Sequence, residues 1–308
     1  MKPNDTLMVV KATHENMKDL VSKYYYKQNQ NSYLAKNFTL EALNTDIGYL
    51  IDKGLSYVSI ENEVPVGYIL GYKVKELFFN NPGVYTPDFA VYFENNQVLY
   101  RLLEVYYEKM KKLNFTHHAM TFLTPFHDDF IIQLGYGLRV IDGVRFPKKY
   151  IINDSEISIK AAEISDFNNL LPIFKEHNLY MSSSPIFLDA EDPSEELNEV
   201  LKDEHKIVFK ILYKLEIIGF SIVDKKYAPG GKYFKDSETL GVKGTHIKRK
   251  YQNKQIGRRY IELLDNYCVD NGYNRLAVDF ESMNLLAVTF WRKHYHLSAK
   301  TYVKYLGK

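Results

Sequence analysis

Basic side chains crowd one short turn in the second half of the chain. They are Lys248, Arg249, Lys250, Lys254, Arg258 and Arg259. The apolar pattern predicts a strand that ends near Ile247 and a helix that starts around Ile256. At such a helix start, unpaired backbone N–H groups and the positive end of the helix dipole point toward the same place. The turn and its cations therefore predict a binding site for a phosphate or diphosphate group.

Gly257 falls in the first turn of the expected helix. Because glycine has no side chain, a phosphate oxygen can approach its backbone closely. Charge-assisted hydrogen bonds contribute about 1.5–3 kcal/mol each, so a few of them suffice for micromolar binding of a diphosphate. A solvated basic helix face is one alternative interpretation of the cations. Nucleic-acid binding is another, but the aromatic residues nearby follow apolar faces and do not alternate with the basic ones.

The helix behind this turn is the most regular element of the sequence. Its apolar residues recur at helical spacing: Ile256, Tyr260, Leu263, Leu264, Tyr267 and Cys268. Asn271-Gly272 supplies the left-handed residue that ends a helix. Cys268 is the only cysteine of the chain and lies on the apolar stripe, so we expect a buried structural thiol and not a nucleophile.

The order of expected elements occurs twice along the chain. Each half has a hairpin with a glycine in its second strand, Gly67 and Gly219, which are 152 positions apart. Each half then continues as strand, helix, strand, short helix and strand. The expected segments are 89–93, 97–113, 118–123, 128–134 and 138–146, and then 239–247, 256–271, 275–280, 285–293 and 300–306. A polar segment at 147–156 separates the halves, so we expect domains at 1–147 and 155–308.

The bulk composition excludes several classes of protein. The chain has 308 residues, a net charge of +2 and one cysteine, which disfavour a nucleic-acid coat protein and exclude an internal disulfide. No apolar run is long enough to cross a membrane, and the first residues do not resemble a secretory signal. The nine histidines show no metal-ligand spacing. We expect a cytoplasmic protein with no metal, no nucleic-acid partner and no membrane partner.

The turn 251–258 reads Tyr-Gln-Asn-Lys-Gln-Ile-Gly-Arg. It resembles the phosphate turn of the GNAT N-acetyltransferases, Arg/Gln-x-x-Gly-x-Gly/Ala. Gln252 and Gly257 match this pattern and Arg258 matches the arginine that often follows it, whereas Gln255 stands where the first glycine is expected. The next landmark of the family is an asparagine followed by an alanine and an aromatic pair on a short helix, and Asn284, Ala287, Phe290 and Trp291 fit it.

The resemblance implies two tandem GNAT-like domains of α/β (α+β) class, each a mixed, mostly antiparallel sheet flanked by helices. It also implies acetyl-CoA as cosubstrate, bound in the second domain. The implied cofactor-binding residues are His246, Ile247, Lys248, Gln252, Asn253, Lys254, Gln255, Ile256, Gly257, Arg258, Asn284 and Trp291.

The corresponding turn of the first half is Glu94-Asn95-Asn96-Gln97, which has no glycine and no basic residue. Its carboxylate would repel a diphosphate. Leu134-Gly135-Tyr136 still matches the closing helix motif of the family. We therefore expect a degenerate first domain that keeps the fold and has lost the cofactor site.

The family often uses a tyrosine at the position of Trp291 to protonate the departing thiolate. Indole cannot do so, and Tyr295, four residues further along the expected helix, is the substitute. For the base that takes the proton from the amine we favour Glu281, with Asp279, Glu238 or a chain of water molecules as alternatives.

Two functions follow from the resemblance. The first is direct transfer of an acetyl group from acetyl-CoA to a primary amine of a small molecule or a peptide. The second is a catalytically silent CoA-binding or scaffold protein. The acceptor wall is expected at 178–192, where carboxylates could meet a cationic amine, although Asp192-Pro193 also reads as the start of a helix.

Overall fold

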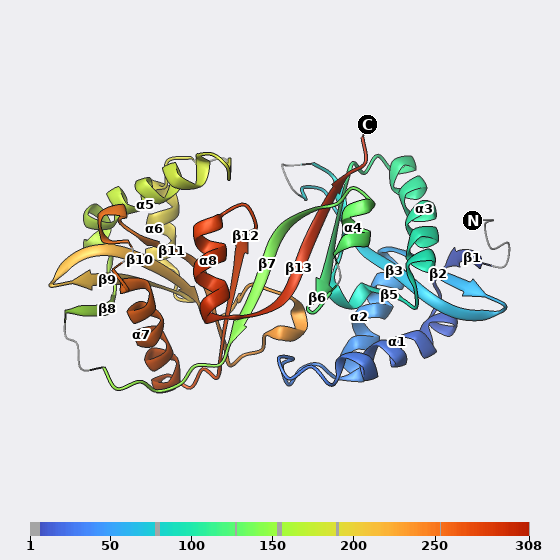
Figure 1. Ribbon diagram of the computed structural model, residues 1–308, viewed down its shortest axis with the longest axis horizontal. Coiled ribbons are helices and arrows are strands. Elements are labelled where there is room, and N and C mark those ends of the chain that lie inside the picture. Colours follow the sequence, from blue (N-terminus) through green and yellow to red (C-terminus); the bar gives the residue numbers. More distant parts are fainter. Residues whose placement is uncertain are drawn as a thin grey trace. The chain divides into compact units, whose positions relative to one another are not determined.

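The computed structural model describes residues 7–77, 81–126, 128–152, 156–188, 191–252 and 254–307 (Figure 1). The chain divides into two compact units. Unit 1 consists of Met1–Val140 and Ala299–Lys308, and unit 2 of Ile141–Ser298. These ranges differ from the expected domains at 1–147 and 155–308, because the last strand of each half of the sequence contributes to the other unit.

Unit 1 is a mixed sheet covered by helices. Its strands follow the order β1 (Leu7–Lys11), β2 (Leu55–Glu61), β3 (Val64–Val74), β4 (Gly83–Thr86), β6 (His117–Leu123) and β13 (His296–Tyr305), and β5 (Val91–Phe93) pairs separately with β3. The pair β4–β6 is parallel, and β13 runs antiparallel to β6 with Ala299 opposite Leu123. The helices are α1 (His14–Gln28), α2 (Leu40–Lys53), α3 (Asn96–Lys112) and α4 (Asp129–Gln133).

The segment expected as a strand at 89–93 is corrected by the structure. Asp88–Ala90 form a short 3-10 turn, η2, and only Val91–Phe93 are extended. The η2 residues are buried, and the carbonyl of Phe89 accepts a hydrogen bond from the Tyr68 hydroxyl at 2.9 Å. The strand that lies parallel to β6 is β4, which the sequence pattern did not single out.

Unit 2 contains the helix that the sequence predicts most clearly, the one that starts at Ile256. Its strand order is β7 (Gly137–Arg145), β12 (Arg275–Glu281), β11 (Thr239–Ile247), β10 (Glu216–Asp224), β9 (Lys206–Tyr213) and β8 (Ile157–Ala161). The helices are α5 (Phe167–Ser182), α6 (Ser194–Lys202), α7 (Ile256–Asp270) and α8 (Leu285–His294). The expected strand 239–247 and the expected start of the helix at Ile256 are confirmed.

Alternate residues of β10 point to opposite faces of the sheet, as a strand requires. Phe220 packs on one face against Phe174 of α5, with ring centroids 3.8 Å apart. Its neighbour Ser221 faces α7 and accepts a hydrogen bond from the Tyr260 hydroxyl at 2.6 Å. Helices α5 and α7 therefore cover opposite faces of this sheet.

A β-bulge in β11 marks where this strand separates from β12. The parallel pairing of β11 with β12 runs from Thr239, opposite Arg275, to Val242, opposite Val278. In the pairing with β10, Val242 lies opposite Val223 and Gly244 lies opposite Ile222. Lys243, between them, is therefore the extra residue of the bulge. Bulges increase the local twist of a strand. Beyond the bulge, β11 follows β10 as far as Ile247.

Within the described residues, no helix is both long and apolar enough to cross a membrane.

Candidate active site

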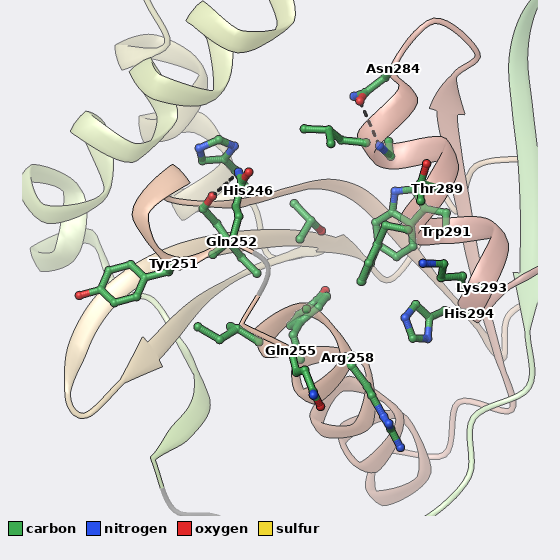
Figure 2. Close-up of a pocket in the computed structure, with 18 of the residues that line it drawn as sticks. His246, Tyr251, Gln252, Gln255, Arg258, Asn284, Thr289, Trp291, Lys293 and His294 are labelled. Carbon is green, nitrogen blue, oxygen red and sulfur yellow. Dashed lines mark hydrogen bonds between the residues drawn. The ribbon is translucent and has the colours of Figure 1, made fainter.

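A cavity of about 480 Å³ lies beyond the bulge of β11 (Figure 2). It is enclosed by the end of β11, the turn before α7, the first turn of α7, one side of α8 and two residues of α5. Its lining includes His177, Tyr180, Thr245, His246, Ile247, Tyr251, Gln252, Gln255, Ile256, Gly257, Arg258, Asn284, Ala287, Phe290, Trp291, Lys293 and His294. All of these residues belong to unit 2.

The first turn of α7 opens into this cavity without a side-chain cap. The cap residue Gln255 makes no side-chain hydrogen bond to the helix. The first helical hydrogen bond here is donated by the Arg259 N–H to the Gln255 carbonyl, at 3.1 Å. The N–H groups of Ile256, Gly257 and Arg258 precede it, so they are available to an anion at the positive end of the helix dipole.

Gln255 itself has a left-handed backbone, with φ of +58°. This is the position at which the resemblance predicted a glycine. A residue other than glycine costs about 1–2 kcal/mol of conformational free energy in this backbone conformation. The turn therefore keeps its backbone shape even though the glycine is missing.

Gln252 fixes the shape of the turn. Its side-chain amide donates to the Ile247 carbonyl at 2.9 Å, which joins the turn to the end of β11. The short 3-10 segment η5, Arg249–Tyr251, lies between them. Gln252 therefore contributes to the site by shaping the loop that leads into α7.

Gly257 has a packing role that the sequence did not reveal. A Cβ atom at this position would lie 2.8 Å from Cε2 of Phe290 on α8. The missing side chain thus lets α8 approach the first turn of α7. Close approach of a phosphate was the expected reason for this glycine, and the structure adds a second one.

Most of the basic residues around the turn do not line the cavity. Lys248 donates to the Ile217 carbonyl at 2.7 Å, and Lys250 pairs with Glu216 at 3.1 Å. Lys254 lies over the ring of Tyr251, 5.4 Å from its centroid. Among the six, Arg258 lines the cavity.

Asn284 joins α8 to α5 at the cavity wall. Its side-chain oxygen accepts the Ala287 N–H at 3.1 Å, which caps α8, and the Tyr180 hydroxyl at 2.7 Å. Trp291 also lines the cavity and packs edge to face against Phe290, with ring centroids 4.9 Å apart.

Nine of the twelve predicted cofactor-binding residues line the cavity. They are His246, Ile247, Gln252, Gln255, Ile256, Gly257, Arg258, Asn284 and Trp291. Lys248 and Lys254 do not line it, for the reasons just given. Asn253 lies outside the described residues.

The two predicted catalytic residues do not line the cavity. Tyr295 follows the last residue of α8 and is 5% exposed, with its ring 5.2 Å from that of Trp291. Burial raises the pKa of its hydroxyl well above the usual value of 10, which makes it a weaker proton donor than an exposed tyrosine. Glu281 is the last residue of β12 and is also outside the lining.

His246, which lines the cavity, pairs with a carboxylate that the sequence did not suggest. Nε2 of His246 is 3.2 Å from Oε1 of Glu176, which also accepts the Arg249 N–H at 2.9 Å. Burial lowers the pKa of His246 below 6.5, and Glu176 opposes this effect. His246 is therefore neutral near pH 7 and able to accept a proton. The two residues are 70 positions apart, so no local spacing could have revealed the pair.

The lining shows no metal site, and no group of three or more His, Cys, Asp or Glu in the described part of the chain is arranged to hold one.

Residues 173–295 match the family model of the acetyltransferase (GNAT) family. This part of the chain is a GNAT acetyltransferase domain. It contains the complete cavity, from His177 of α5 to His294 of α8. Comparison with curated proteins finds no match to the chain.

Two solved structures have the GNAT fold over nearly the whole chain. A GCN5-related N-acetyltransferase from Sphaerobacter thermophilus aligns with 99% of this chain and 97% of its own, at 9% identity and a TM-score of 0.53. A GCN5-related glucosamine N-acetyltransferase region of a fungal multi-domain GH3 β-N-acetylglucosaminidase aligns with 97% of this chain and 38% of that one, at 11% identity and a TM-score of 0.53. These likenesses show the fold, two GNAT-like units with mixed sheets flanked by helices.

The matching helix of unit 1 begins with a side-chain cap. Asn95 caps α3, and its side-chain oxygen accepts the Val98 N–H at 3.1 Å. Glu94 stands beside this cap and pairs with Lys23 at 2.9 Å. The two helices therefore differ in their caps. The start of α7 has no side-chain cap, whereas the start of α3 is capped by the side chain of Asn95.

Proposed function

We propose that this protein is an acetyl-CoA-dependent N-acetyltransferase that acts on a primary amine of a small molecule or a peptide. The observation that carries the proposal is the uncapped first turn of α7 at the edge of a cavity. A diphosphate fits the N–H groups of Ile256, Gly257 and Arg258, because the dipole and the free donors of a helix start favour an anion. The cosubstrate then supplies a thioester for transfer.

The positions of the lining residues in the cavity support one orientation of the ligand. From the first turn of α7, the cavity extends toward His246 and Asn284 on one side (Figure 2). A thioester bound on this side would lie near the His246–Glu176 pair. The nucleotide would remain on the other side of α7, near the end of α8.

We assign the role of base to His246. Its neutral imidazole takes a proton from the ammonium form of the acceptor, and Glu176 stabilises the imidazolium that results. The amine nitrogen then bonds to the acyl carbon as the carbon–sulfur bond breaks, and the thiolate that leaves is protonated to free CoA. Alignment of the two reactants contributes most of the rate, because intramolecular reactions reach effective molarities of about 10⁵ M or more.

We place the acceptor side of the cavity at α5, which contributes His177 and Tyr180 to the lining. Tyr180 lines the cavity, and Leu179 and Phe187 are exposed nearby in the sequence. Asp192 is occupied by the Ser194 N–H, at 3.0 Å, and by Lys175, at 3.5 Å. Asp189, one of the expected carboxylates, lies outside the described residues. The amine function of the acceptor is inferred from the match of residues 173–295 to the GNAT family.

One observation favours a second candidate, a CoA-binding protein without transferase activity. Trp291 occupies the position from which a family tyrosine often protonates the thiolate, and Tyr295 is buried beside it. In this case the cavity would bind CoA with no transfer.

The deciding experiment measures CoA binding and acetyl transfer separately. Titration calorimetry reports binding of acetyl-CoA, and a thiol reagent reports free CoA released in the presence of a panel of primary amines. Cys268, the only cysteine, is buried and will not react with the reagent in the folded protein. We expect binding, and release that depends on the amine and is lost in His246→Gln. Binding without release for any amine would favour the second candidate, and no binding would overturn both.

A further inference from the structure

The acceptor side of the cavity continues from α5 onto the start of α8. His177 and Tyr180 of α5 line the cavity, and Leu286 in the first turn of α8 lines it as well. The Tyr180 hydroxyl donates to Oδ1 of Asn284, the cap of α8, at 2.7 Å, so the two helix ends meet here. Asn284 lies on the same side of the cavity as His246 (Figure 2). The acceptor side therefore consists of His177, Tyr180 and Leu286.

These three side chains present uncharged surface to an acceptor. Nδ1 of His177 is buried and has no hydrogen-bond partner within the described part of the chain. Burial and, to a smaller extent, the nearby His246 lower the pKa of His177 to about 4, so its imidazole is neutral at pH 7. The Tyr180 hydroxyl is already engaged, which leaves the face of its ring. Leu286 adds an apolar side chain that is 60% exposed.

The acidic groups near the acceptor side are engaged elsewhere. Among the lining residues that the structure describes there is no Asp or Glu. Glu176, next to His177 in α5, lies 3.2 Å from Nε2 of His246. Asp192, beyond the end of α5, pairs with Lys175 at 3.5 Å. A second ammonium group on the acceptor would therefore lose its hydration here without gaining a partner.

We propose that the acceptor side selects monoamines with an apolar body over polyamines. The inference rests on the proposed function, because it needs the amine nitrogen at His246 and the thioester beside it. The apolar body then lies against His177, Tyr180 and Leu286 and displaces water from them. Each methylene group buried in this way strengthens binding about fourfold, whereas an unpaired ammonium group weakens it.

The test compares kcat/KM for hexylamine and hexamethylenediamine, which differ by a second terminal amino group. Transfer is followed by the release of CoA thiol at a saturating concentration of acetyl-CoA. We expect the native chain to prefer hexylamine at least about tenfold per amino group. We also expect kcat/KM to rise about fourfold per methylene group from butylamine to hexylamine.

Leu286→Asp tests the assignment of the acceptor side, because it places a carboxylate there. This variant should reduce the preference for hexylamine several-fold, mainly by raising kcat/KM for the diamine. Leu285→Asp is the matched control, since Leu285 is 68% exposed in the same turn and does not line the cavity. Both variants add an acidic residue to the first turn of α8, where the helix dipole favours it, so both should fold. Calorimetric titration with acetyl-CoA checks that each variant keeps its cosubstrate site.

The outcomes separate the inference from the function on which it rests. Equal or better use of the diamine by the native chain would overturn the inference and leave the proposed function intact, and so would transfer confined to polyamines or amino sugars. A shift in Leu285→Asp as large as that in Leu286→Asp would also overturn it, because it would indicate a general charge effect. Absence of transfer to any amine, with acetyl-CoA bound, would overturn the proposed function, and the inference with it.

Discussion

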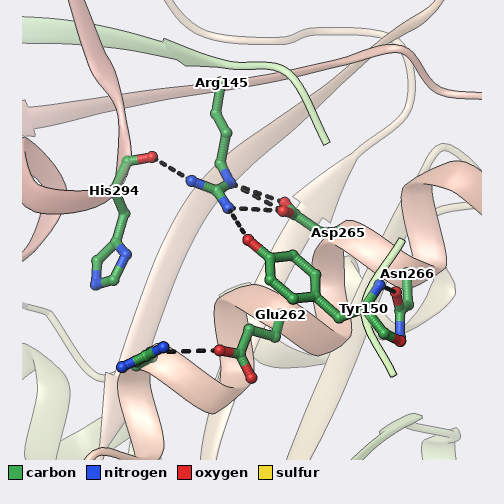
Figure 3. A network of polar contacts seen from close by, with 7 residues as sticks. Arg145, Tyr150, Glu262, Asp265, Asn266 and His294 are labelled. Carbon is green, nitrogen blue, oxygen red and sulfur yellow. Dashed lines mark hydrogen bonds and ion pairs between the residues drawn. The ribbon is translucent and has the colours of Figure 1, made fainter. Parts of the chain in front are cut away.

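Arg145 and Asp265 form a bidentate ion pair inside unit 2, with Nε 2.9 Å from Oδ1 and Nη2 2.7 Å from Oδ2 (Figure 3). Nη2 also donates to the Tyr150 hydroxyl at 3.1 Å. Tyr150 belongs to the segment expected as a linker, and its backbone N–H donates to Asn266 of α7 at 2.7 Å. The end of β7 and the residues after it are therefore part of the framework of the GNAT domain.

We expect Arg145→Met to destabilise unit 2 by about 3–5 kcal/mol, because it leaves a buried carboxylate without its partner. The Asp265 side chain is 0% exposed and that of Arg145 16%. The unfolding of this unit can be followed in urea by the fluorescence of Trp291, the only tryptophan. Lys149→Met is the control, since Lys149 and its partner Asp270 are 54% and 58% exposed and such pairs contribute at most about 1 kcal/mol. Equal shifts in the two variants would contradict the prediction.

Titration with CoA should give one site per chain. The start of α7 is open, whereas Asn95 already caps α3 with its side chain. Calorimetry is the measurement, and the Asn95→Ala variant tests whether Glu94 alone still prevents binding, because this variant removes the cap without adding a cation. We expect one site in this variant too, since Glu94 remains beside the helix start. Two equivalent sites in the native chain would contradict the assignment of unit 1 as the half without a cofactor site.

Gly257→Ala should destabilise unit 2 by about 1–3 kcal/mol and weaken CoA binding, because the new methyl group overlaps Phe290. Adding Phe290→Leu should recover much of the stability. The double variant then separates the two roles of the glycine. If affinity for CoA returns together with stability, packing is the whole reason for Gly257. Affinity that stays low in a stable protein would show that the ligand also needs the bare backbone.

The rate of transfer should fall on the acid side below the ordinary histidine pKa. His246 must be neutral to accept a proton, and burial lowers its pKa below 6.5. The transfer activity that depends on His246 is therefore fully present at pH 7 and is lost as the pH falls through this lowered pKa. Glu176→Gln should move this limb to still lower pH, because Glu176 raises the pKa of His246. His246→Gln should remove the limb and reduce the rate about 10²–10⁴-fold. An unchanged acid limb in that variant would rule His246 out as the base.

Strong periodicity made parts of the fold predictable from the sequence. The apolar stripe from Ile256 to Cys268 fixed the position of α7, and all of its members except the half-exposed Leu263 and Tyr267 are buried. The family turn then located the cavity. The contact between Trp291 and Tyr295 also followed from helical spacing, but spacing does not tell which face of a helix meets the cavity.

Pairing between distant segments was not predictable. The strands β7 and β13 lie next to strands that are distant in the sequence, and nothing in the residue pattern of either strand identifies its neighbour in a sheet. Likewise, Glu176 on α5 meets His246 on β11 only after both elements have packed. Lys293 and His294 are ordinary basic residues for a helix end, where such residues are common. Their place in a cavity wall follows from the approach of α8 to α7.

Most of β7 belongs to unit 2 and most of β13 belongs to unit 1, and this affects the order in which the two units can fold during synthesis. Residues 141–298 leave the ribosome as a complete set for unit 2, whereas unit 1 still lacks 299–308 at that moment. Until β13 emerges, the edge of β6 that it will occupy lacks its final partner, and unpaired edges invite association between chains. Domains usually finish folding in the order of their synthesis. Here the half that is made first is completed last.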